Sequence, residues 1–209
     1  MKEHWDNVYS SREIEKTGWY EKVPEPSLEL ISKIPLGKND LILDIGSGAG
    51  TFIDNLVARG FENIAACDIS GIALNALATR LGTTNASKVR FLTDDVTRPA
   101  ELRELKNVAL WHDRALLHFL LEEEQQRAYR TTLNSVLSDN GYVIIAAFSL
   151  KGVQKCSGLN IKNYDQEMIA GFLGDEFRLL HDFDYLYHTP SGDPRPYVYT
   201  LFQKTGASG

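Results

Sequence analysis

The sequence predicts an α/β fold, in which a doubly wound, mostly parallel sheet carries helices on both of its faces. First, short apolar runs that read as strands alternate with helix-like stretches along most of the 209 residues, as in sheets covered on both sides. Second, the last two apolar runs flank a segment rich in proline and glycine, which predicts a hairpin and an antiparallel edge. The content of 43% hydrophobic and 24% charged residues indicates a chain with a sizeable core.

Each expected element follows from a run of residues taken in order. Strands are expected at Leu41–Asp44, Ile64–Asp68, Val89–Leu92, Val108–Trp111 and Tyr142–Phe148. Helices are expected at Ala115–Leu121 and near Asp165–Leu173, with a polar, glycine-rich loop preceding the second of them. The final pair of strands, Phe177–Tyr187 and Tyr197–Gln203, forms the hairpin and completes a mixed sheet of seven strands.

The segment DIGSGAG follows the first strand and begins at Asp44. Its glycines, Gly46, Gly48 and Gly50, allow unusual φ angles and let the backbone approach a ligand closely. A dinucleotide fingerprint would have its third glycine at Thr51, so the spacing disfavours NAD and FAD. A carboxylate at Asp44 accepts hydrogen bonds from an ammonium group and repels a pyrophosphate. The turn therefore suits a cationic ligand, although a tight turn that serves helix packing alone has the same pattern.

Acidic residues also end the second and third strands. Asp68 follows Asp44 at roughly the 20-residue offset expected for an acid that binds a ribose. In the segment TDDV, Asp95 would accept a hydrogen bond from an adenine amino group, and Val96 would offer the ring an apolar face. Asp94 and Asp95 could each instead cap the turn that follows the strand. The order of these acids predicts a nucleoside site along the carboxyl edge of the sheet.

The segments DIGSGAG, CDIS, TDDV and LWHDRALLHFL together resemble class I S-adenosylmethionine-dependent methyltransferases, and the resemblance extends roughly over residues 41–148. The resemblance implies a Rossmann-like sheet of seven strands whose last strand is antiparallel. It also implies that Asp44 serves the methionine end of S-adenosyl-L-methionine and that Asp68 holds its ribose. The residues that we expect to contact the cofactor are Asp44, Gly46, Ser47, Gly48, Asp68, Ile69, Asp94, Asp95, Val96, Trp111, Trp19 and Tyr20.

The domain boundaries follow from the same comparison. We expect one methyltransferase domain over residues 1–204, made of a helical lid (1–35), a cofactor-binding core (41–148) and a substrate loop, helix and hairpin (149–204), before a tail at 205–209. The lid contains Trp5, Tyr9, Trp19 and Tyr20, more aromatic surface than a free tail carries. Its W-D-x-x-Y pattern resembles the start of small methyltransferases that include protein-lysine methylating members. Simple packing of this helix against the domain is the alternative.

Methyl transfer from a sulfonium is an in-line displacement that needs alignment above all, and a base only where the acceptor arrives protonated. The residues after the fourth strand are therefore the catalytic candidates. His112 and Asp113 could each act on the acceptor or could each be a hydrogen-bonded cap. His118 lies among apolar residues and is expected in the core. The Asn-Pro-Pro-Tyr/Phe motif of enzymes that methylate adenine and glutamine nitrogens is missing, which disfavours those acceptors.

Residues beyond the fifth strand are expected to border the acceptor. The candidates are Lys155, Cys156, Tyr164 and His188, with Arg195 on the rim of the hairpin. A nucleophilic role for Cys156 is disfavoured, because methyl transfer rarely needs a covalent intermediate. We expect no metal, since Cys156 and His188 are two separated ligands and do not make a site by themselves.

Charge and composition restrict the acceptor. The net charge of −6 gives no basic field for nucleic acid. There is no apolar run that approaches a membrane span, and the two cysteines lack metal-ligand spacing, which indicates a cytoplasmic protein with free thiols. A small molecule with a nucleophilic N, O or S is the expected acceptor, and a protein lysine is the alternative. A non-catalytic module that binds the cofactor is a reading from another class.

The shape of the site should separate the first two readings. A protein-directed enzyme should leave the lid and the hairpin rim open as an acidic groove, whereas an enzyme acting on a small molecule should enclose its pocket.

Overall fold

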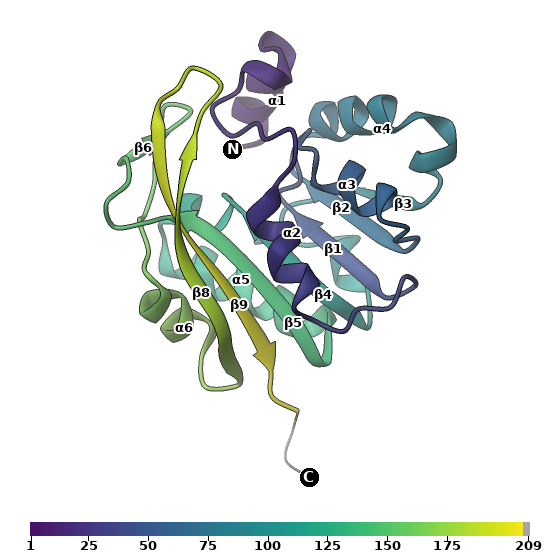
Figure 1. Ribbon diagram of the computed structural model, residues 1–209, viewed down its shortest axis with the longest axis vertical. Helices are drawn as coiled ribbons and strands as arrows, with labels where there is room; N and C mark the ends of the chain where they lie inside the picture. Colours follow the sequence, from purple (N-terminus) through teal and green to yellow (C-terminus); the bar gives the residue numbers. More distant parts are fainter. Residues whose placement is uncertain (207–209) are drawn as a thin grey trace.

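The sheet of the computed structural model has seven strands in the order β3-β2-β1-β4-β5-β9-β8 (Figure 1). The structure describes residues 1–206, so positions 207–209 of the expected tail lie outside the described residues. The strands are β1 (Leu41–Ile45), β2 (Ile64–Asp68), β3 (Val89–Thr93), β4 (Val108–Arg114), β5 (Leu137–Phe148), β8 (Phe177–His188) and β9 (Pro194–Lys204). Strands β1 to β5 pair in parallel, and β9 is antiparallel to both of its neighbours. The predicted seven-stranded fold with a reversed last strand is confirmed.

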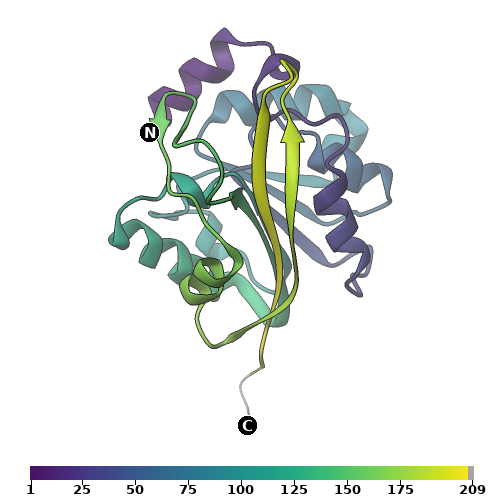
Figure 2. The ribbon, with the colours of Figure 1, turned by 60° about the vertical axis from the view of Figure 1, so that its left-hand side comes forward.

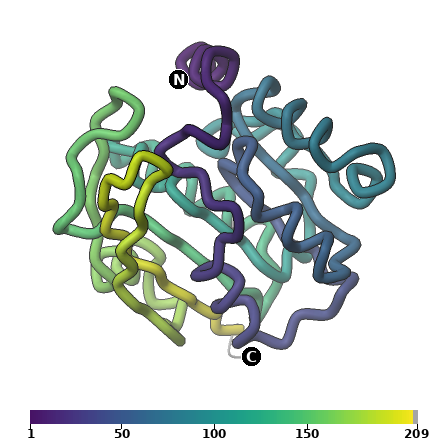
Figure 3. The backbone as a smooth tube through the Cα atoms, turned by 45° about the horizontal axis from the view of Figure 1, so that its top comes forward, coloured from purple at the N-terminus to yellow at the C-terminus, as the bar shows by residue number. Residues whose placement is uncertain are grey.

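Helices lie on both faces of this sheet. They are α1 (Lys2–Ser11), α2 (Glu25–Ser32), α3 (Phe52–Ala58), α4 (Gly71–Ala86), α5 (Glu123–Val136) and α6 (Gln166–Leu173), with short 3-10 turns η1 (Ile14–Lys16), η2 (Leu102–Glu104) and η3 (Leu117–Phe119). Helices α2, α3 and α4 pack on one face, and α5 and α6 pack on the other (Figure 2). Helix α1 stands outside these layers and packs against α4 (Figure 3).

The strand β1 shows how the sequence builds this core. Successive side chains of a strand point to opposite faces, and here Leu43 and Ile45 join the core cluster under α5 and α6. Ile42 joins the cluster under α2, α3 and α4. All three are buried. A strand covered on both sides therefore needs apolar residues at consecutive positions, which is why this run could be recognised in the sequence.

The helix expected at Ala115–Leu121 is wrong. The chain leaves β4 through Ala115 with φ of 71°, a left-handed conformation that no α-helix accommodates. The N–H groups of Leu116 and Leu117 donate to the Asp113 carboxylate, and only the turn η3 follows. Helix α5 begins two residues after Leu121, at a capping box. Asp113 therefore fixes a tight turn where the apolar spacing indicated a helix.

Two smaller features complete the description. Part of the loop expected before α6 forms a short antiparallel pair, β6 (Lys155–Cys156) and β7 (Leu159–Asn160). Within residues 1–206, none of the helices has the length and apolar character needed to cross a membrane.

Candidate cofactor and acceptor site

A cavity lies at the carboxyl ends of β1 to β4, the edge at which open α/β sheets bind ligands. The N-terminal segment closes it from outside. Its walls are formed by Met1, Trp5, Tyr9, Trp19, Ile45, Gly46, Cys67, Asp68, Ile69, Asp94, Asp95, Val96, Arg114, Ala115, Leu116, Phe119, Leu120 and Cys156. The wall is largely apolar, and it brings the ends of several strands together with the lid. Of the twelve residues expected to contact the cofactor, seven line this cavity: Trp19, Gly46, Asp68, Ile69, Asp94, Asp95 and Val96.

Two side chains, those of Leu116 and Tyr9, pack closely against the glycine turn after β1. Gly46 and Gly48 have φ angles of 67° and 55°, which favour glycine over any residue with a Cβ. A Cβ at Gly46 would collide with the side chain of Leu116, and one at Gly48 would collide with the hydroxyl of Tyr9. Glycine is therefore favoured at both positions by the backbone and by the close approach of a side chain, which is Leu116 at Gly46 and Tyr9 of the lid at Gly48.

Asp68 presents a carboxylate that is held in place by the backbone. Its two oxygens accept hydrogen bonds from the N–H groups of Gly48 and Ser70, each at 2.8 Å. The side chain lies on the cavity wall, and burial raises the pKa of Asp68 to about 6. A fixed carboxylate with free lone pairs can accept hydrogen bonds from the two hydroxyls of a ribose.

The two acids after β3 differ in how many of their carboxylate oxygens accept hydrogen bonds from the protein. The Asp94 carboxylate accepts hydrogen bonds from the N–H groups of Ala100 and Leu102, at 2.9 and 2.8 Å, so it stabilises the turn as the capping alternative describes. Asp95 uses Oδ1 to accept from both the N–H and the hydroxyl of Thr97. No hydrogen bond among residues 1–206 uses Asp95 Oδ2. Asp95 thus retains an acceptor for a ligand.

Aromatic side chains of the N-terminal segment form one wall of the cavity. The ring of Trp5 lies 5.2 Å from that of Phe119 and 5.8 Å from that of Trp19, edge to face in both pairs. Tyr9 completes this group, with its ring 6.1 Å from that of Trp19. Edge-to-face pairs at these separations are favourable. The group gives the cavity several ring faces that can stabilise a cation.

Hydrogen bonds hold the N-terminal segment over the cavity. The Asp6 carboxylate accepts from the hydroxyl of Ser70, at 2.7 Å, two residues after Asp68. Further along, the hydroxyls of Thr51 and Tyr187 donate to backbone carbonyls of residues 21 and 20, each at 2.5 Å. The segment is therefore attached both to the start of α4 and to the hairpin.

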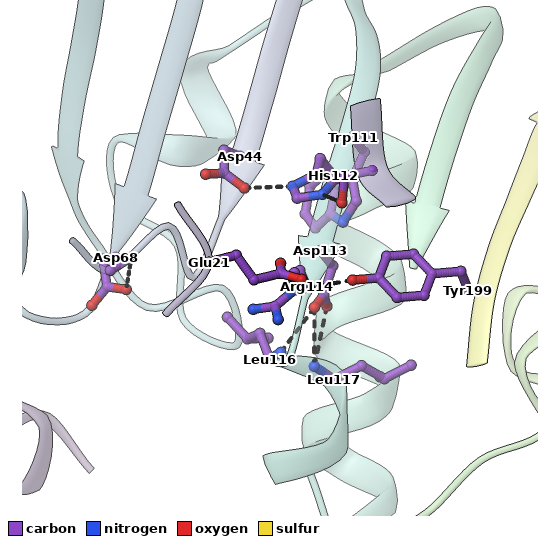
Figure 4. Close-up of polar contacts among 12 residues, drawn as sticks. Glu21, Asp44, Asp68, Trp111, His112, Asp113, Arg114, Leu116, Leu117 and Tyr199 are labelled. Atoms are coloured by element: carbon purple, nitrogen blue, oxygen red, sulfur yellow. Dashed lines mark hydrogen bonds and ion pairs between the residues drawn. The ribbon is translucent and has the colours of Figure 1, made fainter. Parts of the chain in front are cut away.

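His112 and Asp113, the predicted catalytic residues, lie outside the cavity wall. Figure 4 shows both residues, with Asp44 beside His112 and the turn at Leu116 and Leu117 below Asp113. His112 Nδ1 is 2.7 Å from Asp44 Oδ1, and Nε2 is 2.8 Å from the hydroxyl of Ser27. Its ring stacks on that of Phe52, and 1% of its surface is exposed. Asp44 and His112 are register partners in β1 and β4, so Asp44 faces a histidine instead of the cavity.

Asp113 is also fully engaged by the protein. It accepts the hydroxyl of Tyr129 at 2.8 Å, besides the two N–H groups of the turn after β4. It has no exposed surface, and burial raises the pKa of Asp113 to about 6. The cap alternative describes Asp113, which accepts from the turn after β4, whereas His112 is hydrogen-bonded to two side chains inside β4 and caps no helix.

Trp111 requires a correction. Its side chain points into the core under α5, where Nε1 donates to the hydroxyl of Tyr129 at 2.8 Å and none of its surface is exposed. It therefore has no access to a cofactor. Tyr20, Ser47 and Gly48 do not line the cavity, and the carbonyl of Tyr20 accepts a hydrogen bond from the hydroxyl of Tyr187.

The residues expected at the acceptor are separated in space. Cys156 lies on the cavity wall. Tyr164 is buried in the core, with 1% of its surface exposed, which excludes it from acceptor contact in this conformation. Lys155 and His188 are exposed and lie outside the wall. Both cysteines are free thiols. Among residues 1–206 no cluster of three or more His, Cys, Asp or Glu side chains is arranged to hold a metal ion.

The sequence analysis missed an ion pair between Glu21 and Arg114. Arg114 Nε is 2.9 Å from Glu21 Oε2 and donates to the hydroxyl of Tyr199 at 3.1 Å, and Nη1 donates to the carbonyl of Trp19 at 3.0 Å. Both side chains are about nine-tenths buried, with 11% of Arg114 and 8% of Glu21 exposed. The HDR segment pointed to Arg114, but no spacing could show that the lid and the hairpin supply its partners.

The fold and the cavity together describe an α/β protein with a largely apolar, acid-bearing pocket at the carboxyl edge of its sheet, the place at which proteins of this architecture bind ligands. A family model for a methyltransferase domain matches residues 42–141. The EEF1A lysine methyltransferase 2 proteins of Danio rerio and Mus musculus are 27% and 30% identical to this chain over 70% of its length. The matched regions span 67% and 64% of those two relatives, so about one third of each has no counterpart in the match.

A solved structure shares the fold. The 1,6-didemethyltoxoflavin-N1-methyltransferase of Burkholderia thailandensis, with S-adenosylhomocysteine bound, superposes with a TM-score of 0.68 at 18% identity, covering 98% of this chain and 84% of that one. The chain carries the domain of the methyltransferase family matched over residues 42–141 and is an S-adenosylmethionine-dependent methyltransferase. The cofactor expected from the sequence is that of this family.

Proposed function

We propose that this methyltransferase transfers a methyl group to the ε-amino group of a lysine in a protein. The observation that carries the proposal is the similarity to two EEF1A lysine methyltransferase 2 proteins across 70% of the chain. This moves the lysine acceptor, the second choice on sequence alone, ahead of a small molecule. The N-terminal W-D-x-x-Y pattern supports the same choice.

The cavity suits an amine that becomes positively charged. Ring faces of Trp5, Trp19 and Phe119 stabilise a sulfonium or an alkylammonium by cation–π attraction. Glu21, with Oε2 2.9 Å from Arg114 Nε, neutralises the charge of Arg114. The arginine therefore does not repel a cationic sulfonium or alkylammonium from the cavity. A lysine that enters an apolar, water-poor cavity favours its neutral form. Alignment and desolvation therefore supply the chemistry without a dedicated base.

We propose that the cofactor lies along the carboxyl edge, with its ribose at Asp68 and its adenine between Ile69 and Val96, near Asp95 Oδ2. When bound, the cofactor supplies an electrophilic methyl on a sulfonium. The aromatic wall of Trp5, Trp19 and Phe119 then borders the remaining space, in which an acceptor side chain would enter. Cys156, on the same wall, would contact that side chain.

A small-molecule acceptor is the second candidate, and a specific observation favours it. Helix α1 and Trp19 cover the cavity, whose wall is mostly apolar, as expected for an enclosed pocket. The toxoflavin N1-methyltransferase of Burkholderia thailandensis has such a small acceptor bound.

One labelling experiment separates the readings. The protein is incubated with methyl-labelled S-adenosylmethionine and a desalted cell extract, and in parallel with a panel of small amines, phenols and thiols. We expect label in protein, located on lysine by mass spectrometry. Label confined to small molecules supports the second candidate, and binding of S-adenosylhomocysteine without label transfer in either arm indicates a non-catalytic module. The Asp68→Ala variant serves as the control for cofactor dependence. The cytoplasm is our proposed location, because both cysteines are free.

A further inference from the structure

We propose that the Glu21–Arg114 ion pair recognises the amino-acid head group of the cofactor, with Arg114 binding its carboxylate and Glu21 its ammonium group. The inference rests on the family's cofactor and is independent of the acceptor. It assigns the methionine end of the cofactor to a residue of the lid and a residue at the end of β4.

Arg114 has a donor that the protein leaves unused. Its Nε and Nη1 groups donate to Tyr199 and to the carbonyl of Trp19, whereas Nη2 is buried without a hydrogen-bond partner among residues 1–206. A guanidinium carries five N–H donors and remains charged. A buried donor of a charged group without a partner is costly. Because Arg114 also lines the cavity, a ligand carboxylate is the partner that would remove this cost.

Glu21 leaves an acceptor unused beside that donor. Its Oε2 atom touches Arg114 Nε at 2.9 Å but has no hydrogen-bond partner in residues 1–206 and is shielded from solvent. Burial raises the pKa of Glu21, so its charged form lacks the solvation that a partner would replace. An ammonium group supplies that partner. An ion pair in which the carboxylate oxygen Oε2 and the guanidinium nitrogen Nη2 both lack a directed hydrogen bond is complementary to a zwitterion.

The pair also lies where the head group should be. Figure 4 shows Glu21 and Arg114 between Asp44 and Tyr199, with Asp68 on the other side of Asp44. A ligand with its ribose at Asp68 and its sulfur over the glycine turn would therefore extend its far end toward the ion pair. Asp44, to which the resemblance gives the methionine end, bonds to His112 and does not line the cavity. Glu21 does not line the cavity either, but it is paired with Arg114, which does, so it is the acid that stands beside the binding position for the head group.

The arrangement has a second consequence for the lid. Glu21 and the carbonyl of Trp19 both contact Arg114, so a bound head group would bridge the N-terminal segment to the end of β4. The 5′-methylthioadenosine nucleoside, which lacks the head group, would leave this bridge unformed.

The test is isothermal titration calorimetry with S-adenosylhomocysteine and with 5′-methylthioadenosine. In Arg114→Gln we expect the dissociation constant for S-adenosylhomocysteine to rise at least about tenfold, and that for 5′-methylthioadenosine to change less than about threefold. Glu21→Gln should act in the same direction. The matched control is Arg178→Gln, which makes the same substitution at an exposed arginine of β8 outside the cavity.

Equal losses for both ligands in Arg114→Gln would mean a purely structural role and would overturn the proposal. Unchanged affinity for S-adenosylhomocysteine would also overturn it. In that case benzoate is titrated into the S-adenosylhomocysteine complexes of the wild-type protein and of Arg114→Gln. Benzoate binding that is seen only with the wild-type protein would assign the arginine to an acidic acceptor.

A second measurement needs no variant. The wild-type protein should bind the methyl ester of S-adenosylhomocysteine at least about tenfold more weakly than the free acid, and equal affinity would overturn the proposal. Failure of the wild-type protein to bind any of these ligands would instead contradict its use of the cofactor. The failure of this inference and of the proposed function are thus distinguishable.

Discussion

Asp68 combines burial with hydrogen bonds that hold its charge ready for a ligand. Burial raises the pKa of Asp68 to about 6, while the N–H groups of Gly48 and Ser70 partly oppose that rise. The carboxylate is therefore mostly ionised at neutral pH but close to its titration range. A ligand that needs an ionised acceptor will respond to pH at this residue.

We expect Asp68→Asn to weaken binding of S-adenosylhomocysteine at pH 7.5 by about 1–3 kcal/mol, because a charge-assisted acceptor for the ribose is lost. In the wild-type protein, binding prefers the ionised carboxylate. Its affinity should be nearly full at pH 7.5 and should fall as the pH decreases through about 6.

Calorimetry at pH 7.5, 6.5 and 5.5 measures both effects. The Asp68→Asn variant, which has no titrating group at this position, should show a flatter profile. A wild-type profile parallel to that of the variant would remove Asp68 from the site.

Positions at strand ends could be predicted from the sequence, but the extent of β4 could not. The strand was expected to end at Trp111, and it continues to Arg114. His112 and Asp113 therefore lie inside the sheet, flanked by β1 and β5, and Arg114 takes the position at the cavity. Alternation along the strand then sends Trp111 into the core. A strand is recognised in the sequence by its apolar run. Where polar residues continue the strand, as in β4, its end cannot be located from the sequence.

Among the elements, α1 is the least embedded part of the site. One of its residues, Val8, is buried, and its attachment relies on the Asp6–Ser70 hydrogen bond and the aromatic contacts of Trp5 and Tyr9. Elements with few buried contacts open at low free energy. Because Trp5 and Tyr9 of α1 line the cavity, we expect the cofactor to enter when α1 opens and a bound cofactor to hold it closed.

The Trp5→Ala variant tests this coupling. Loss of the ring contacts with Trp19 and Phe119 should weaken S-adenosylhomocysteine binding by about tenfold. In the wild-type protein, the ligand should slow hydrogen exchange at residues 2–11, and in the variant this protection should shrink. Glu3→Ala, at an exposed position of the same helix, is the matched control. If Trp5→Ala binds as tightly as the control does, α1 packs on the domain without covering the cofactor.

Local signals account for most of the elements. The alternating apolar runs located every strand of the sheet, and the Pro- and Gly-rich segment located the hairpin of β8 and β9. The elements that were missed depend on tertiary contacts. The turn after β4 is fixed by a buried carboxylate, and the Glu21–Arg114 pair joins residues that are far apart in the chain. The residues at the carboxyl edge that line the cavity could therefore be predicted, while the lid and hairpin contacts could not.

For the molecule as a whole, buried titratable groups make opposing contributions to stability. Burial raises the pKa values of Asp68 and Asp113 to about 6, above the ordinary value for an unfolded aspartate. Their contribution to folding stability is largest at low pH and decreases as the pH rises through 6. His118 acts in the opposite direction. Burial lowers the pKa of His118 to about 3, so the unfolded chain binds a proton below pH 6.5 that the folded chain does not take up.

The contribution of His118 can be isolated by His118→Phe. Its ring stacks on Phe148 at 4.8 Å, and neither ring nitrogen has a hydrogen-bond partner within the described residues, so phenylalanine keeps the packing and loses no polar contact. Because of His118, the free energy of unfolding should decrease as the pH falls below 6.5. The decrease should reach about 2 kcal/mol at pH 5. The variant should therefore gain about 2 kcal/mol relative to the wild-type protein between pH 7.5 and pH 5.

Urea unfolding of both proteins at the two pH values measures this difference. Asp68 and Asp113 titrate in both proteins, so their contributions cancel. His188→Gln, at an exposed histidine of the hairpin, should leave the difference from wild type the same at both pH values. A constant offset between His118→Phe and the wild-type protein would mean that His118 takes up its proton in the folded state, through a water or a movement that opens the core around Phe148.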